Sequence, residues 1–197
     1  MSDNGVNNGR RRFLVAATSV VGVVGAVGVA TPFVKSWNPS AKAKAAGAPV
    51  KVNVSKLEPG QQVVYEWRGK PVFVVRRTRA MLDELKSLDD QLRDPDSNNS
   101  EQPPYAKNEA RSLNSEFLVL VGLCTHLGCS PKYLPEVKPM DFDAHWKGGY
   151  HCPCHGSKFD LAGRVYKGVP APTNLVVPPY TLNSDGVMII GKDEENA

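Results

Sequence analysis

All four cysteines and three of the four histidines of this sequence fall in or beside two short motifs. Residues 124–129 read Cys-Thr-His-Leu-Gly-Cys, and residues 152–157 read Cys-Pro-Cys-His-Gly-Ser, directly after His151. Thiolates and imidazoles are common ligands of transition metals, and one tight turn can direct ligands spaced this closely to a common centre. Gly128 and Gly156 allow the backbone a close approach. The motifs therefore predict a metal centre held by two loops.

Two other interpretations of the cysteines stay open on spacing alone. A structural zinc site would use Cys and His ligands, but it would leave two of the cysteines without a role. Two disulfides would suit an exported domain, but they would not require a histidine close to a cysteine in each motif. The pairing of two matched motifs favours the metal centre.

The charge of the chain is concentrated ahead of the motifs. The whole chain carries a net charge of +4, of which residues 1–44 contribute six bases and one acid, and residues 45–197 contribute eighteen bases and nineteen acids. The basic character therefore belongs to a short leader. A nucleic-acid-binding function for the rest of the chain has no electrostatic support.

The leader contains an uncharged apolar stretch from Phe13 to Val34. As a helix it would span about 33 Å, enough to cross a hydrocarbon core of about 30 Å. Arg10, Arg11 and Arg12 precede it and, with the following Phe-Leu, resemble a twin-arginine export signal, which carries folded proteins. The positive-inside rule then places residues 1–12 in the cytoplasm and the C-terminal body on the periplasmic side of a bacterial inner membrane.

We therefore expect a cytoplasmic leader over residues 1–12, a retained transmembrane anchor over 13–34 and a flexible linker over 35–50. Cleavage near Ala41-Lys42-Ala43, which resembles a signal-peptidase site, is the alternative to a retained anchor. The body, residues 51–197, is long enough to bury one core.

The patterning of the body predicts a mainly β fold. Only Met81–Leu92 has apolar residues at helical spacing, which predicts one amphipathic helix of about 13 residues followed by an exposed polar loop over 94–104. Strand patterns occur at 50–54, 63–67, 71–76, 116–123, 175–177, 180–183 and 187–191.

Together, the motifs, leader and β body resemble the Rieske iron–sulfur proteins, specifically the iron–sulfur subunit of the quinol–cytochrome c reductase (cytochrome bc1) complex. The resemblance covers nearly the whole chain. It implies an antiparallel Rieske-type β-sandwich with a cluster-binding part at about residues 122–172, a transmembrane helix and one helix-loop insertion. It also implies one 2Fe–2S cluster. One iron would be bound by Cys124 and Cys152 and the other by His126 and His155, with a disulfide between Cys129 and Cys154.

The resemblance implies a function as well. The chain would accept an electron and a proton from membrane quinol and pass electrons to a c-type cytochrome, as an oxidoreductase subunit that is not catalytic alone, with cytochrome b and cytochrome c1 as partners. Two neutral imidazoles in place of thiolates make the cluster easier to reduce. By the same resemblance, His155 contacts the quinol, Leu127 covers the cluster, and the Ser157 hydroxyl hydrogen-bonds a bridging sulfide. Gly168 and Pro170 belong to a loop that shields its third side.

The sequence departs from that family in three places. Val169 is inserted in the proline loop at 167–172, the stretch 130–149 is longer than in mitochondrial members, and Phe159 stands where high-potential members have a tyrosine that donates a hydrogen bond to a cysteine sulfur. We expect His145 and Trp146 to be surface or packing residues rather than ligands. The alternative function is that of the small Rieske subunit of arsenite oxidase. A soluble ferredoxin fits less well because such proteins lack the second cysteine pair.

Overall fold

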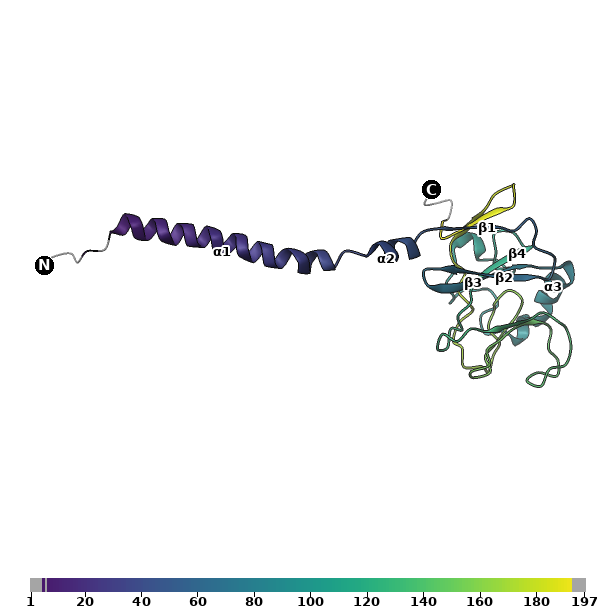
Figure 1. Ribbon diagram of the computed structural model, residues 1–197. Coiled ribbons are helices and arrows are strands. Elements are labelled where there is room, and N and C mark those ends of the chain that lie inside the picture. The colour runs from purple at the N-terminus through teal and green to yellow at the C-terminus, as the bar shows by residue number, and fades with distance from the viewer. Residues whose placement is uncertain (1–4, 6, 193–197) are drawn as a thin grey trace. The chain divides into compact units, whose positions relative to one another are not determined.

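The computed structural model describes residue 5 and residues 7–192 (Figure 1). The chain divides into two compact units, Met1–Ala45 and Ala46–Ala197. The first unit consists of helices. The second holds every strand assigned in the described residues, together with both motifs.

The first unit contains a long apolar helix, α1 (Asn8–Ser36). The side chain of Asn7 caps it by accepting a hydrogen bond from the amide of Arg10 at 3.2 Å. Within residues 8–45, an 18-residue window has a mean hydropathy of 2.2 and no buried residue, so this helical region is long and apolar enough to cross a membrane. The predicted anchor, residues 13–34, lies entirely within α1.

The predicted linker is not wholly irregular, because α2 (Ala41–Ala46) is a short helix within it. Alanine and lysine are strong helix formers, and the Ser40 hydroxyl accepts a hydrogen bond from the amide of Ala43 at 3.1 Å. Local propensity therefore gives structure to a segment that lacks apolar periodicity.

The second unit is built from three antiparallel sheets of three strands each, which confirms the predicted fold class. Two of the sheets use the strands predicted from alternation. Their strands are β2 (Gln62–Trp67), β3 (Lys70–Arg76) and β4 (Phe117–Val121) in the order β2-β3-β4, and β1 (Val50–Asn53), β9 (Val187–Ile190) and β8 (Tyr180–Leu182) in the order β1-β9-β8.

The third sheet carries the motifs and was not predicted. It consists of β5 (Lys132–Leu134), β6 (Gly149–His151) and β7 (Lys158–Phe159), which are too short to show alternation. The strand predicted at 175–177 is wrong. Val176 does accept a hydrogen bond from the amide of Val121 at 2.8 Å, but two prolines follow at 178 and 179 and remove the donors that a ladder needs.

The main core lies between the sheets and continues to the base of the motifs. Val72, Val74, Val119 and Leu120 are fully buried, and they form one cluster with the cysteines that open the two motifs. The ring of Phe73 on β3 stacks on that of Tyr150 on β6, with centroids 5.8 Å apart. The rigid sheets thus support the metal-binding loops directly.

The helical insertion begins as predicted but changes type halfway. Thr78 caps α3 (Arg79–Glu84), after which the chain tightens into a 3-10 helix, η1 (Leu85–Gln91). At the transition the carbonyl of Leu85 accepts a hydrogen bond from the buried guanidinium of Arg164 at 2.7 Å. Arg164, which is distant in sequence, thus bonds the backbone where the helix type changes. Apolar periodicity does not reveal such a contact.

The loop predicted to be exposed over 94–104 is partly buried instead. Asp94 is 6% exposed, and its carboxylate accepts hydrogen bonds from the amides of Asn98 and Asn99 and from the Ser100 hydroxyl, at 2.6 to 3.0 Å. Burial favours the neutral acid, but these hydrogen bonds outweigh it and hold the pKa of Asp94 below its usual value.

A second 3-10 turn, η2 (Pro104–Ala106), begins at the end of the 94–104 loop.

Candidate metal centre

The two motifs fold into turns with the same hydrogen-bond pattern. In the first, the carbonyl of Cys124 accepts from the amide of Gly128 at 2.9 Å, and the amide of Cys124 donates to the carbonyl of Cys129 at 2.7 Å. In the second, Cys152 makes the equivalent bonds to Gly156 at 3.0 Å and to Ser157 at 2.8 Å. The two turns therefore present their side chains in the same way.

A glycine is needed in each turn because of its backbone conformation. Gly128 has φ of +80° and Gly156 has φ of +75°, in the left-handed region that other residues adopt at a cost. A Cβ atom at either position would meet nothing within 4 Å. Among the protein atoms, the requirement for glycine therefore comes from the dihedral angle.

The turns bring four candidate ligands together as two pairs. Cys124 and Cys152 are buried free thiols whose side chains are hydrogen-bonded to each other, and the His126 and His155 rings lie 4.8 Å apart at 87°. His126 is half-buried, whereas His155 is exposed. This set of two sulfurs and two nitrogens matches what a Rieske 2Fe–2S cluster requires.

The environment of the Cys124 thiol favours its neutral form. Burial raises the pKa of the Cys124 thiol, and the adjacent Cys152 thiol adds to the rise, while hydrogen bonds from the His126 amide and the Ser157 hydroxyl oppose it. Binding of a metal would therefore displace the proton from the Cys124 sulfur.

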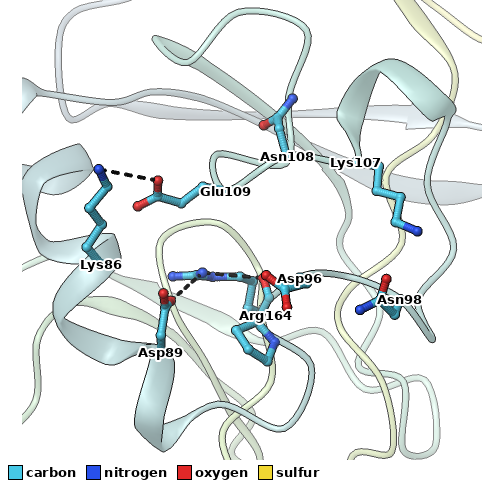
Figure 2. A pocket seen from close by; sticks show the side chains of 9 residues that line it. Lys86, Asp89, Asp96, Asn98, Lys107, Asn108, Glu109 and Arg164 are labelled. Carbon is cyan, nitrogen blue, oxygen red and sulfur yellow. Dashed lines mark hydrogen bonds and ion pairs between the residues drawn. The ribbon is translucent and has the colours of Figure 1, made fainter.

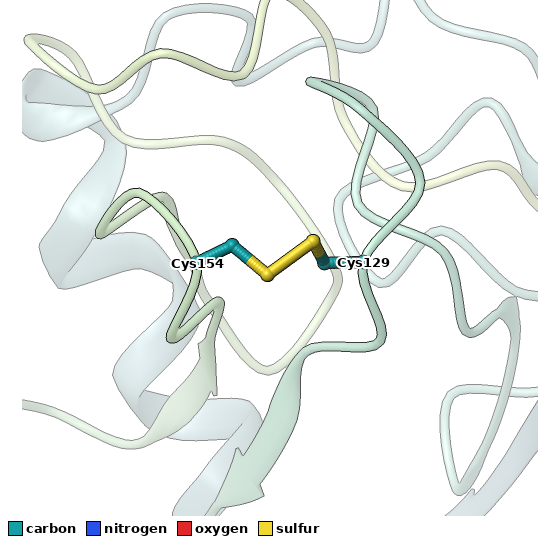
Figure 3. Close-up of a disulfide and its surroundings, with 2 residues drawn as sticks. All are labelled: Cys129 and Cys154. Atoms are coloured by element: carbon teal, nitrogen blue, oxygen red, sulfur yellow. A yellow bond between two sulfur atoms is a disulfide. The ribbon is translucent and has the colours of Figure 1, made fainter.

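The other two cysteines form a disulfide that joins the motifs, as Figure 3 shows. Cys129 and Cys154 have Cα atoms 6.7 Å apart, within the range of ordinary disulfides. Their sulfurs and that of Cys152 lie within 4.8 Å of one another, but the bonded pair has no free thiolate to give a metal. The candidate sulfur ligands are therefore Cys124 and Cys152, and the predicted disulfide is confirmed.

The proline loop at 167–172 is bonded to the second motif, and Thr173, which follows it, is bonded to the first. The amide of Ala171 donates to the Ser157 hydroxyl at 3.1 Å, and the Thr125 hydroxyl donates to the carbonyl of Thr173 at 2.7 Å. Ala171 is fully buried, while Gly168 and Pro170 are exposed. Sequence reasoning did not single out Thr125, because its partner lies 48 residues along the chain.

The inserted Val169 is accommodated by packing inward. It contacts a second core formed by Leu88, Leu92, Trp146 and Tyr166, and its carbonyl accepts a hydrogen bond from Arg93 at 3.0 Å. The insertion therefore ties the proline loop to the end of η1. Trp146 is a buried packing residue and His145 is exposed, as expected for residues that are not ligands.

At the tip of the first motif, Leu127 is 71% exposed next to His126. Together with the exposed His155, it presents an apolar side chain and an imidazole to the surroundings.

A cavity of about 500 Å³ lies elsewhere, between η1, residues 95–98 and residues 107–109 (Figure 2). None of its lining residues belongs to either motif. Three cationic and three acidic side chains line it, so it carries no net charge that would select a ligand. The lining residues are Lys86, Asp89, Pro95, Asp96, Asn98, Lys107, Asn108, Glu109 and Arg164.

Comparisons with known proteins agree with this geometry. The family described as "Rieske [2Fe-2S] domain" matches residues 48–181, and that described as "Ubiquitinol-cytochrome C reductase Fe-S subunit TAT signal" matches residues 1–40. Because the Rieske family matches more than half of its length, the chain is a Rieske iron–sulfur protein whose cofactor is a 2Fe–2S cluster.

The relatives define the family more closely. The ubiquinol-cytochrome c reductase iron-sulfur subunit of Allochromatium vinosum is 58% identical over 197 residues, covering 100% of this chain and 95% of the relative. That of Rhodospirillum rubrum is 42% identical over 192 residues, covering 96% of each. A chain of a solved "Hyperthermophilic respiratory Complex III" is 28% identical with a TM-score of 0.49, covering 89% of this chain and 98% of its own length. The chain belongs to the ubiquinol–cytochrome c reductase iron–sulfur subunits, and the arsenite oxidase alternative is not favoured.

Phe159 gives a prediction about the redox potential. It is fully buried on β7 and has no donor for a cysteine sulfur. A hydrogen bond to a charged acceptor is worth about 1.5–3 kcal/mol, of which about 1 kcal/mol would differ between the oxidation states, equal to about 40 mV for one electron. We expect Phe159→Tyr to raise the midpoint potential by that amount in a titration followed by electron paramagnetic resonance.

Phe159→Leu serves as the control, because it disturbs the packing without adding a donor and should not raise the potential. If a crystal structure of Phe159→Tyr places the new hydroxyl on the sulfur while the potential stays the same or falls, the explanation is wrong.

Proposed function

We propose that Cys124 and Cys152 hold one iron of the cluster and that His126 and His155 hold the other. The observation that supports this most directly is the pairing of two matched turns, which places the free thiols in contact and the imidazole rings 4.8 Å apart. The disulfide and the proline loop shield the site from two further sides. When bound, the cluster takes up and releases one electron.

We propose that His155 contacts quinol. Its ring is exposed, and an imidazole that coordinates through one nitrogen keeps the other free to hold a proton. The exposed Leu127, which follows His126 in the first motif, offers an apolar surface for a ring that leaves the membrane. The shielding loop around Gly168 and Pro170 keeps water from the opposite side, and Ser157 orients the second motif through Cys124 and Ala171.

The proposed activity is transfer of electrons from quinol to a c-type cytochrome, with cytochrome b supplying the quinol site and cytochrome c1 accepting the electron. The test uses the assembled complex in membranes. Added quinol should reduce the cluster, seen as its low-temperature magnetic resonance signal, and should drive reduction of cytochrome c1. If the cluster in the assembled complex is intact but added quinol does not produce its signal, this role is excluded.

We also propose the arrangement of the chain in the membrane: residues 1–12 in the cytoplasm, 13–34 as the anchor, 35–50 as the linker, and 51–197 in the periplasm. The three arginines in the first turns of α1, directly ahead of the apolar residues 13–34, support this orientation. Protease added to spheroplasts should release a soluble fragment that contains the cluster. Protection of the domain until the membrane is opened would reverse the orientation.

A further inference from the structure

The loop that carries Cys152 and His155 begins and ends at one rung of the third sheet. His151 on β6 is paired with Lys158 on β7. One residue further on, the amide of Cys152 donates to the carbonyl of Ser157 at 2.8 Å and closes the turn. The position of this rung therefore sets the position of the whole loop.

Two neighbouring residues of the long inter-motif segment, residues 130–149, contact both members of the rung. The ring of Phe142 stacks on that of His151, with centroids 3.8 Å apart and planes 2° from parallel. The carboxylate of Asp143 accepts a hydrogen bond from the Lys158 ammonium at 2.5 Å. One turn of the segment thus holds both ends of the second loop.

The inter-motif segment is itself firmly packed. Trp146 is 1% exposed, its indole N–H donates to the carbonyl of Leu134 at 3.0 Å, and its ring packs near that of Tyr166. The backbones of Met140 and Asp143 exchange two hydrogen bonds of 2.9 and 3.0 Å. Phe142 and Asp143 are therefore presented from a defined turn.

The Asp143–Lys158 pair is partly buried, which makes its charges effective. The Asp143 side chain is 17% exposed and that of Lys158 is 21% exposed. Burial opposes ionisation of Asp143, but the bonds from Lys158 and from the His145 amide outweigh it, and the pKa of Asp143 lies below its usual value. The lowered pKa favours the carboxylate form of Asp143, and the carboxylate and the Lys158 ammonium form an ion pair in which each cancels the field of the other beside the loop.

We propose that Phe142 and Asp143 are positioning residues of the cluster site: Phe142 fixes the rung below the second loop, and Asp143 cancels the positive charge that Lys158 would otherwise present to the centre. The inference rests on the proposed function and extends it to the inter-motif segment, a part of the chain outside both motifs. It assigns this segment a role in setting the redox potential.

The test compares Asp143→Asn, Lys158→Met and the double variant in the full chain within its complex, by redox titration at a single pH. An uncompensated Lys158 favours the more negative reduced state, so Asp143→Asn should raise the reduced-to-oxidised ratio at a fixed applied potential about threefold. Lys158→Met leaves the Asp143 charge and should lower the ratio by a similar factor. The double variant should lie near the wild type.

The surface pair Arg79–Asp83 provides a matched control. It lies 3.4 Å apart with side chains 89% and 65% exposed, so Asp83→Asn removes the same charge where solvent screens it and should leave the ratio unchanged. For the stacking contact, Phe142→Leu should speed the loss of cluster absorbance in the presence of a chelator.

Opposite shifts in the two single variants support the inference, because damage to the fold would move both in the same direction. Shifts of equal sign, no shift, or loss of the cluster from both variants would overturn it. A wild-type chain with no Rieske signal would instead refute the proposed function, so the two failures are distinguishable.

Discussion

Replacement of Cys124, His126, Cys152 or His155 by alanine is expected to abolish the Rieske signal and to leave the chain without stoichiometric iron. Each substitution removes one of the four proposed donors, of which each turn contributes one sulfur and one imidazole. With three of these residues left, one iron would lack a protein ligand. The measurement is iron and sulfide content together with low-temperature magnetic resonance.

His145 is the matched control for the histidine variants. It is exposed and lies in the same domain, so His145→Ala should keep the full signal. The sheet formed by β2, β3 and β4 should remain folded in all of the variants, because its strands pair with one another and not with the motifs. Any one variant that retains a full Rieske signal removes its residue from the ligand set.

Removal of the disulfide should make the cluster labile while the sheets stay folded. The bond between Cys129 and Cys154 closes a segment of 25 residues, for which chain entropy predicts about 3.5 kcal/mol of stabilisation. If all of this stabilisation opposes the separation of the two loops, its loss raises the equilibrium constant for their separation by about two orders of magnitude. We expect the double variant Cys129→Ala/Cys154→Ala to lose its cluster absorbance faster under a chelator by up to this factor.

The double variant is preferred to either single one. A single substitution leaves a free thiol close to Cys152, whose sulfur lies within 4.8 Å of both disulfide sulfurs, and that thiol could compete as a ligand. Wild-type protein treated with a thiol reductant is measured in parallel, because reduction breaks the same bond without a substitution. Peptide mapping without reduction that finds both cysteines as free thiols in the native complex would disprove the role of the bond.

The ligand candidates and the main strands were predictable because their signals are local. Each motif places its cysteine and histidine within a few residues, and the strands of the first two sheets show apolar or alternating patterns over three to seven residues. The contacts that hold the site were not predictable in this way. Thr125 meets Thr173 and Ala171 meets Ser157 only after the sheets have formed.

The errors have the same origin. The 94–104 loop looked exposed because it is polar, but Asp94 satisfies that polarity internally and Asn174 donates to the Asp94 carbonyl at 2.9 Å. The inter-motif segment gave no periodic signal, yet Trp146 anchors it in the second core. Polar composition predicts exposure only where no internal partner is available.

The pairing of β1 with β9 has a consequence for biosynthesis. β1 is the first strand of the domain, and all four of its residues are paired with β9, which follows both motifs in the chain. On a ribosome, β1 therefore emerges before both motifs, and it stays unpaired with β9 until all four proposed cluster ligands have been synthesised. The sheet that closes the domain cannot form co-translationally around an incomplete site, so the chain reaches the export machinery as a finished domain only after its synthesis has passed β9.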